Sequence, residues 1–212
     1  MKRLIILAFA ASLLACNSKN EEEFTPLPEE ELASLNLPEG FGIHTFANVE
    51  NARSLAVSPT GTVFVGNRRK DKVYALRDTD GDWKADEVYI LDSALRSPNG
   101  VAFHNGDLYV AEISRILKYP DIENNLQDTP EPEVVYDEYP TEAHHGWKYI
   151  AFGPDGKLYV PVGAPCNICK SDDAVFASIT RMNPDGSGME IVANGVRNSV
   201  GFDWHPESGE LW

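Results

Sequence analysis

The chain has 212 residues and is strongly acidic, with 33 aspartates and glutamates against 18 lysines and arginines and a formal net charge of −15. A negative field of this size repels phosphate backbones and anionic lipid, which argues against nucleic acid as a partner. Neutral sugars, alcohols and bound cations remain compatible with it. The length is enough for one sizeable core or two small ones.

Residues 1–15 are typical of an export signal. Lys2 and Arg3 form a basic start, an apolar run too short to span a bilayer follows, and a small residue precedes Cys16. The stretch "LLAC" resembles the lipobox of bacterial lipoproteins, whose cysteine becomes the lipidated first residue; an ordinary cleaved secretory signal is the alternative. Acyl chains on Cys16 would anchor the protein without a spanning helix. We therefore expect an exported protein, lipid-anchored at the outer membrane on its periplasmic or cell-surface side.

Residues 16–36 contain "NSKNEEEFTPLPEEE", which is polar, acidic and proline-bearing. Such a composition buries too little apolar surface to fold, so we expect a solvated tether. The remaining residues, 37–212, are expected to form the folded domain.

The folded region repeats one pattern four times. Each copy is an alternating strand, a turn rich in Gly, Pro, Asn or Asp, and a second alternating strand. The copies are "LAVSPTGTVFV", "VAFHNGDLYV", "IAFGPDGKLYV" and "VGFDWHPESGELW", and their turn glycines stand 45, 50 and 53 residues apart at Gly61, Gly106, Gly156 and Gly209. A hairpin that recurs at nearly constant spacing indicates a repeat architecture.

Further strand-like runs at 71–76, 86–91, 114–120, 132–137 and 177–193 supply a second strand pair for each copy. Four strands per repeat predict an all-β fold, a β-propeller, rather than a β-sandwich, which would tolerate less regular self-similarity. The 176 residues from Leu37 to Trp212 amount to roughly three and a half blades, whereas a closed ring needs at least about four. The sequence also stops inside a predicted strand. We therefore expect a piece of a longer protein.

Several motifs occur together in the order found in one family. They are "VFVGNRRKDKVYAL", "SPNGVAFHNGDLYVAEISRILKYP", "HHGWKYIAFGPDGKLYVPVGAPCNIC" and "RMNPDGSGMEIVANGVRNSVGFDWHPESGELW". Residues 37–212 thereby resemble the sorbosone dehydrogenase branch of the glucose/sorbosone dehydrogenases, which use pyrroloquinoline quinone (PQQ). The resemblance implies a six-bladed propeller that oxidises an aldose-like sugar or sugar aldehyde. It also implies PQQ and Ca²⁺ as cofactors and an external electron acceptor.

His145 is the predicted catalytic base. The family's base is a histidine eight residues before the first Gly of "GPDG", and counting back from Gly153 gives His145. Imidazole titrates near neutral pH, so it can take the proton of a sugar hydroxyl while hydride leaves the carbon. If the segment is extended, His144 points elsewhere. The alternative is a pair of surface or structural histidines.

Arg197 and Asn198, in "GVRNSVGF", match the family's pair that contacts the quinone. PQQ carries three carboxylates, so a guanidinium can bind its oxygens bidentately and stabilise negative charge during reduction. Lys148 occupies a position where the family carries a basic residue, and Arg68, in "GNRRK", is a further candidate for a carboxylate clamp. An arginine capping a blade turn and an exposed basic loop are the structural alternatives for Arg197 and Arg68.

The sequence departs from the glucose-oxidising branch after "VPVG". That branch has an acid there to orient the catalytic histidine, whereas this chain has Ala164. The orienting group is therefore unassigned, and simple glucose dehydrogenase behaviour is not expected. Cys166 and Cys169 follow in "PCNIC", a loop with Asn167 that fits the sorbosone branch. Outside the cytoplasm, a pair at this spacing most often forms a local disulfide, and it lacks partners for a zinc or haem site.

An aspartate-rich turn, "DTDGDWKADE", is the candidate calcium site. It offers carboxylates at alternate positions, as calcium requires, through Asp78, Asp80, Asp82 and Asp86. It is not an EF-hand, because its glycine is the fourth residue of the loop rather than the sixth. A solvated turn that aspartates simply favour is the alternative. The calcium that the family places beside the cofactor is held by residues expected beyond Trp212.

Two other functions suit a propeller. One is a non-catalytic carbohydrate- or protein-binding propeller, since this fold hosts many functions. The other is a calcium-dependent propeller lactonase, whose central metal needs Asp, Glu and Asn ligands. The basic set of Lys148 and Arg197 beside a histidine favours an anionic cofactor over a central metal.

Overall fold

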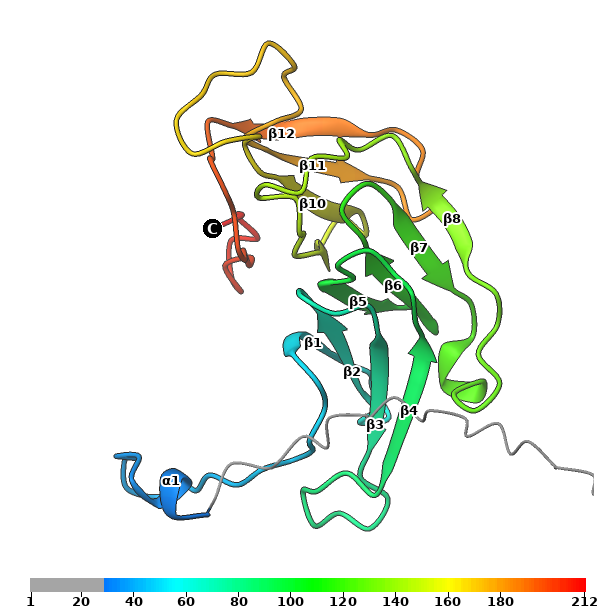
Figure 1. The fold of residues 1–212 in the computed structure, drawn as a ribbon, viewed down its shortest axis with the longest axis vertical. Helices are drawn as coiled ribbons and strands as arrows, with labels where there is room; N and C mark the ends of the chain where they lie inside the picture. Colours follow the sequence, from blue (N-terminus) through cyan, green and yellow to red (C-terminus); the bar gives the residue numbers. More distant parts are fainter. Residues whose placement is uncertain (1–28) are drawn as a thin grey trace, which may run out of the picture.

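The computed structural model describes residues 29–212, which form three antiparallel sheets of four strands each (Figure 1). The first sheet consists of β1 (Ala52–Val57), β2 (Val63–Asn67), β3 (Val73–Arg77) and β4 (Glu87–Asp92). The second consists of β5 (Gly100–His104), β6 (Asp107–Ala111), β7 (Ile116–Tyr119) and β8 (Glu133–Tyr136). The third consists of β9 (Ala151–Phe152), β10 (Leu158–Val162), β11 (Ser178–Met182) and β12 (Glu190–Asn194).

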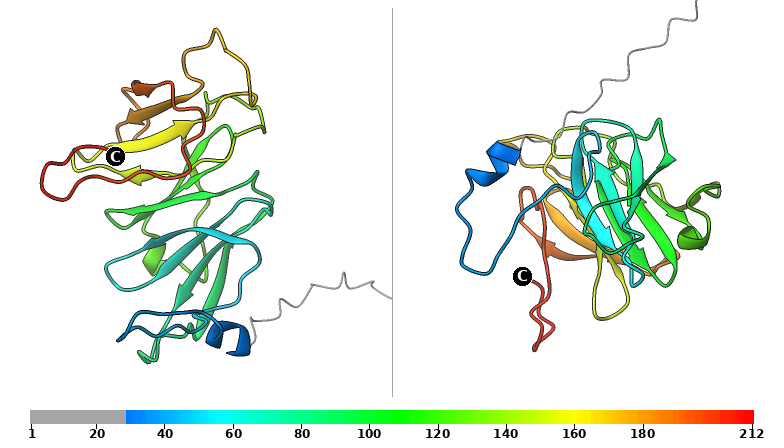
Figure 2. Two further views of the ribbon diagram at one scale, coloured as in Figure 1. Left: turned by 90° about the vertical axis from the view of Figure 1, so that its left-hand side faces the viewer. Right: turned by 90° about the horizontal axis from the view of Figure 1, so that it is seen from below.

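Each sheet is a meander whose strands pair in chain order, so each is one blade of a propeller. The blades follow one another in an arc, and a turned view shows the third above the second and the second above the first (Figures 1 and 2). β5 contacts both β1 and β9, so the first strand of each blade lies at the inner edge of the arc. The predicted all-β propeller with four strands per repeat is confirmed.

The repeated glycines mark hairpin turns that require a left-handed backbone. Gly61 and Gly106 both have φ near +92°, a region that residues with a side chain rarely adopt. Gly61 closes the turn between β1 and β2, and Gly106 closes the turn between β5 and β6. Glycine at these positions therefore fixes where each blade's first hairpin bends.

The core lies between the blades because strand side chains alternate between two faces. On β6, Leu108 and Val110 pack into the layer shared with the first blade, while Tyr109 and Ala111 pack into the layer shared with the third. All four side chains are buried. A blade in the middle of the arc is therefore apolar on both faces and needs a neighbour on each side.

The hairpin predicted at 200–212 forms only a single antiparallel bridge, between Trp204 and Leu211. A two-stranded ribbon with no further strand to pair with is marginal, and here it is held by packing. Phe202 and Trp204 pack edge-on against Tyr159 of the third blade or against one another. This segment therefore occupies the place of a fourth blade's first hairpin.

The expected leader, residues 1–15, and the lipidation site Cys16 lie outside the described residues. Most of the tether lies outside them as well, but at its end the chain forms a short exposed helix, α1 (Glu29–Ala33), where irregular structure is predicted. Its residues are three glutamates followed by leucine and alanine, which all have good helix propensity. Apart from one 3₁₀ turn, η1 (Ile122–Asn124), no other helix occurs from residue 29 onwards, and neither of these could cross a membrane.

Replacing Leu108 by Ala is expected to lower the free energy of unfolding by about 2–5 kcal/mol, because it leaves a cavity between two blades. Leu108 has no exposed surface. Leu55, which is 60 % exposed on β1, offers the matched control: Leu55→Ala should change stability by less than about 0.5 kcal/mol. Urea denaturation followed by fluorescence measures both, and equal losses would contradict the inter-blade core.

Candidate functional site

The predicted site residues lie on connections at one end of the blades. Neighbouring strands are antiparallel, so the loop joining the second and third strands of a blade lies at the same end as the connector leading to the next blade. His145 precedes β9, Arg197 follows β12, and the loop at 163–177 joins β10 to β11. These three connections, the ones that enter, cross and leave the third blade, bring residues far apart in sequence together.

His145 sits in a turn, closed by a hydrogen bond from the Gly146 N–H to the Ala143 carbonyl at 3.1 Å, and its φ is +52°. The expected extended segment, with His144 pointing elsewhere, is therefore wrong. The turn keeps the rings of His144 and His145 edge to face, with centroids 4.1 Å apart.

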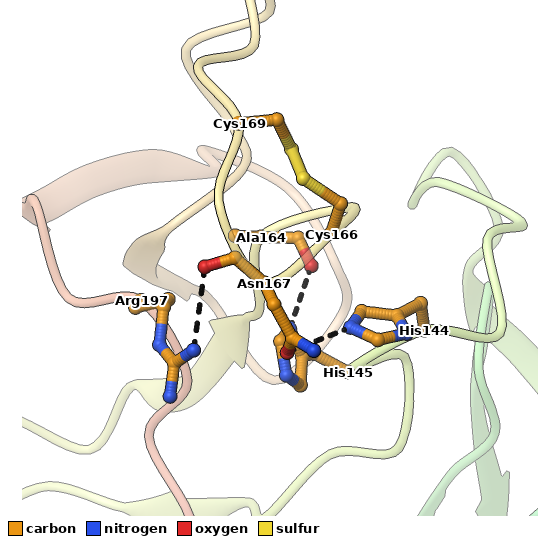
Figure 3. Close-up of a disulfide and its surroundings, with 7 residues drawn as sticks. All are labelled: His144, His145, Ala164, Cys166, Asn167, Cys169 and Arg197. Atoms are coloured by element: carbon orange, nitrogen blue, oxygen red, sulfur yellow. Dashed lines mark hydrogen bonds between the residues drawn. A yellow bond between two sulfur atoms is a disulfide. The ribbon is translucent and has the colours of Figure 1, made fainter.

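The Nδ1 atom of His145 lies 2.9 Å from the backbone carbonyl of Ala164 (Figure 3). A carbonyl can only accept a hydrogen bond, so Nδ1 carries the proton and donates it. In the neutral ring, Nε2 is then the unprotonated nitrogen, the form needed to accept a proton. The orienting group that the sequence leaves unassigned is therefore the main-chain oxygen of Ala164.

Gly163 allows the connector to approach this closely. A Cβ added at Gly163 would lie 2.5 Å from the Cβ of His145 and 3.1 Å from the side-chain oxygen of Asn198. Any side chain there would force these groups apart. His145 and the Asn198 amide therefore lie over the same glycine.

Arg197 contacts the same loop. Its carbonyl accepts a hydrogen bond from the Ala164 N–H at 2.8 Å, and its Nη1 lies 3.4 Å from the carbonyl oxygen of Asn167. The side chain is otherwise exposed. Arg197, Asn198 and His145 are thus brought together around Gly163 and Ala164, as an active-site arrangement requires.

Asn167 joins the two halves of the cluster, a role that the sequence did not predict. It lies within the loop closed by the Cys166–Cys169 disulfide, whose Cα atoms are 5.7 Å apart (Figure 3). Its side-chain oxygen lies 3.2 Å from Nε2 of His144, and its carbonyl faces Arg197. The one sequence signal for this role is its position between the two cysteines.

Lys148 lies in the interior, with 1 % of its surface exposed. Its Nζ lies 3.4 Å from the Gly146 carbonyl and 4.9 Å from the centre of the Tyr139 ring. Burial disfavours the charged form and lowers the pKa of Lys148 from its ordinary 10.5 to about 8. The predicted cofactor-binding lysine therefore points its ammonium into the protein, against an aromatic face.

Arg68 lies apart from the contacts around Ala164. Its guanidinium stacks on the ring of Trp147 at 4.8 Å, and that of Arg53 lies over the same ring at 5.3 Å. Trp147 is 8 % exposed, and both guanidiniums lie over its ring. Trp147 and Arg53 were not predicted, because nothing in the sequence shows that the connector before the third blade meets the first blade here.

Unpaired arginines gather at this end of the blades. In residues 29–212, the arginines that form ion pairs with acids are Arg77, Arg115 and Arg181. The five that do not are Arg53, Arg68, Arg69, Arg96 and Arg197. All five lie on or beside the loops and connectors at the end of the blades that carries the site, so their guanidiniums are not engaged by acids of residues 29–212.

The aspartate-rich turn joins β3 to β4 and therefore lies at the opposite end of its blade from the β2–β3 loop. Carboxylate oxygens of Asp78, Asp80 and Asp86 lie within 4.8 Å of one another, but Asp82 is not part of the group. The Asp82 carboxylate instead accepts the Lys84 N–H at 2.8 Å. Two hydrogen bonds from Thr79 lower the pKa of Asp86. Calcium at this turn stays a prediction, with three rather than four candidate ligands.

The chain matches one family model, described as a domain of unknown function, DUF7133, over residues 27–210. It belongs to the DUF7133 family. An uncharacterized protein of Borreliella burgdorferi is 25 % identical to it over 196 residues, which cover 87 % of this chain and 50 % of that protein. The DUF7133 chain thus spans about half the length of this relative.

Two solved structures share the fold of this DUF7133 protein. The PQQ-bound aldose sugar dehydrogenase of Streptomyces coelicolor has a TM-score of 0.59 and 23 % identity, over 80 % of this chain and 57 % of its own. The PQQ domain of pyranose dehydrogenase from Coprinopsis cinerea, in its holo form, has a TM-score of 0.62 and 12 % identity, over 73 % of this chain and 41 % of its own. At these identities, the likeness shows the propeller architecture.

Replacing Lys148 by Met should remove a pH-dependent term from stability. The folded protein loses the Lys148 proton near pH 8, whereas the unfolded chain keeps it to about 10.5. The unfolded state binds more protons between these values, so wild-type stability rises with pH there relative to the variant. Between about pH 7 and about pH 10, the free energy of unfolding of the wild type should rise by about 3 kcal/mol relative to that of Lys148→Met.

Urea unfolding at several pH values measures this difference. Lys170→Met, at an exposed position, controls for the loss of a surface lysine. A constant difference between the wild type and Lys148→Met over the whole range would contradict a buried, desolvated ammonium.

Proposed function

We propose that this DUF7133 chain is part of a PQQ-dependent oxidoreductase that oxidises a sugar or sugar aldehyde, with His145 as the general base. The observation that carries the proposal is the 2.9 Å contact between Nδ1 of His145 and the Ala164 carbonyl, which leaves Nε2 free to accept a proton. The sequence motifs support the sorbosone or aldose branch in particular. The two solved structures with this fold are a PQQ-bound aldose sugar dehydrogenase and the PQQ domain of a pyranose dehydrogenase, which supports PQQ as the cofactor and a sugar as the substrate.

The residues beside His145 suit an anionic cofactor. Arg197 is exposed and forms no ion pair among residues 29–212, so its guanidinium can bind carboxylate oxygens bidentately. The Asn198 amide, which lies over Gly163, adds both a donor and an acceptor. PQQ, when bound, would supply the acceptor for the two electrons released from the sugar carbon.

The chain's own residues would then handle the proton. Nε2 of His145 takes the proton of the sugar hydroxyl, and the resulting imidazolium keeps its Nδ1 hydrogen bond to Ala164. The carbonyl dipole stabilises that positive charge without gaining a proton itself. Asn167 contacts His144, the neighbour of the base, through its side chain and Arg197 through its carbonyl oxygen, so it links the segment that carries the base to the cation.

The proposal has three further parts. The enzyme uses calcium, passes its electrons to an external acceptor, and is exported and lipid-anchored through Cys16. For calcium, the support is the group of Asp78, Asp80 and Asp86. A lactonase-like central metal is less well supported, because this group, the candidate metal site within residues 29–212, lies at the far end of the first blade from its connector. A binding propeller without catalysis remains the rival that activity measurements decide.

Replacing His145 by Ala in the full-length protein, loaded with PQQ and calcium, should lower sugar-dependent reduction of an artificial dye by roughly 10²–10⁴-fold, the usual contribution of a general base. Steady-state dye reduction measures this. His44→Ala, at an exposed position before the first blade, is the matched control and should keep full activity. Undiminished turnover in His145→Ala would reject the assigned base.

Replacing Arg197 by Lys should weaken PQQ binding by roughly tenfold or more, because an ammonium keeps the charge but cannot bind two oxygens at once. Quenching of protein fluorescence during PQQ titration measures the affinity. Arg181→Lys is the control, since Arg181 is engaged by Asp155 and Glu190 on the sheet. If both variants bind PQQ as tightly as the wild type, Arg197 does not contact the cofactor.

A further inference from the structure

A basic pocket lies on the first blade, at the end of the propeller that carries the proposed cofactor site. It has a volume of about 410 Å³ and is bounded by the β2–β3 loop, with Arg68 and Arg69, and by the connector from β4 to β5, with Arg96 and Ser97. We propose that this pocket binds the carboxylate or phosphate group of a small molecule, at a site separate from the one proposed for PQQ.

The charges of the pocket favour an anion. Arg68, Arg69 and Arg96 form no ion pair with any acid among residues 29–212. The acid on its wall is Asp71, whose carboxylate faces the Ala94 N–H at 3.3 Å. Lys70 also lines the pocket, but Glu50 neutralises it at 2.5 Å. Three guanidiniums against one carboxylate leave the pocket positive on a chain of net charge −15.

The walls are held in place before any ligand arrives. The Ser97 hydroxyl donates to the Arg68 carbonyl at 2.5 Å, and the Leu95 N–H donates to the Asp71 carbonyl at 3.1 Å. These two bonds tie the β2–β3 loop to the connector. A ligand would therefore lose little affinity to ordering of the pocket backbone.

Arg96 is fixed through its backbone while its charge stays available. The buried Glu112 accepts the Arg96 N–H, but the charge of Glu112 is neutralised by Arg115. The Arg96 guanidinium donates to the Thr141 carbonyl at 3.0 Å, a neutral partner. Its remaining N–H groups can still bind an anion, since a guanidinium has five.

The pocket and the proposed cofactor site involve different residues of the 141–148 connector. His145 faces Ala164 on the third blade, whereas Trp147 is covered by Arg68 of the first blade. The residues that line the pocket include none of His145, Ala164, Arg197 and Asn198. The positive charge at Arg69 and Arg96 is therefore not accounted for by the contacts around His145.

The chemistry of the ligand follows from the donors. Guanidinium groups match the two oxygens of a carboxylate or phosphate, and a neutral sugar offers no charge to pair with them. A volume of about 410 Å³ suits a molecule of small-ligand size rather than a polymer. Sugar acids and sugar phosphates share this chemistry, so both belong in the test.

Calorimetric titration of the full-length protein with glucuronate, glucose 6-phosphate and glucose at low salt tests the proposal. At least one anion should bind saturably and glucose should not; the arm that binds identifies the carboxylate or the phosphate. Arg69→Ala and Arg96→Ala should each weaken the binding roughly tenfold or more. Arg77→Ala, an arginine of the same blade already paired with Glu87, should leave it unchanged.

Three outcomes would overturn the proposal. The first is that neither anion binds saturably. The second is that Arg69→Ala and Arg96→Ala bind the anion as tightly as the wild type does. The third is that PQQ displaces the anion. Displacement would show that the pocket belongs to the cofactor site. Because the titration needs no turnover, it decides the question even if the protein proves not to be an oxidoreductase.

Discussion

Burial of both faces of each sheet between neighbouring blades is the constraint on which the rest of this structure depends. Leu108 and Val110 face one neighbour and Tyr109 and Ala111 face the other, so the middle blade cannot exist alone without exposing a large apolar surface. This packing sets the blades at fixed angles around the inner edge. It is also what brings connectors that are far apart in sequence to one end of the arc.

The candidate site follows from that arrangement. His145 enters from the connector before β9, Arg197 comes from the segment after β12, and the β10–β11 loop lies between them. The Ala164 carbonyl holds the His145 ring, the Ala164 N–H holds the main chain of Arg197, and Gly163 leaves the space that lets these segments approach. A site built on backbone groups keeps its geometry while the surrounding side chains vary, which suits a scaffold on which different chemistries occur.

The arginines of this protein differ in whether an acidic side chain forms an ion pair with them. Arg77 and Arg181, on strands, and Arg115, on the β6–β7 loop, are paired with acids, whereas Arg53, Arg68, Arg69, Arg96 and Arg197 form no ion pair in residues 29–212. A guanidinium without a carboxylate partner keeps its charge and its N–H donors available for a ligand. Both proposals for anionic ligands rest on arginines of this kind.

The sequence by itself determined the strands and their repeat. Alternation of apolar residues and glycine turns are local signals, because they depend on the backbone preferences of a few residues at a time. The resemblance to a known family then pointed to His145, Arg197 and Asn198 as candidate site residues. The tertiary structure alone decided that Ala164 orients His145, that Lys148 is buried and that Arg68 lies over Trp147. The contacts of His145 with Ala164 and of Arg68 with Trp147 join groups about 20 and about 80 residues apart, and Lys148 is buried because its connector packs against Asn99 and Tyr139, so no local pattern in the chain encodes them.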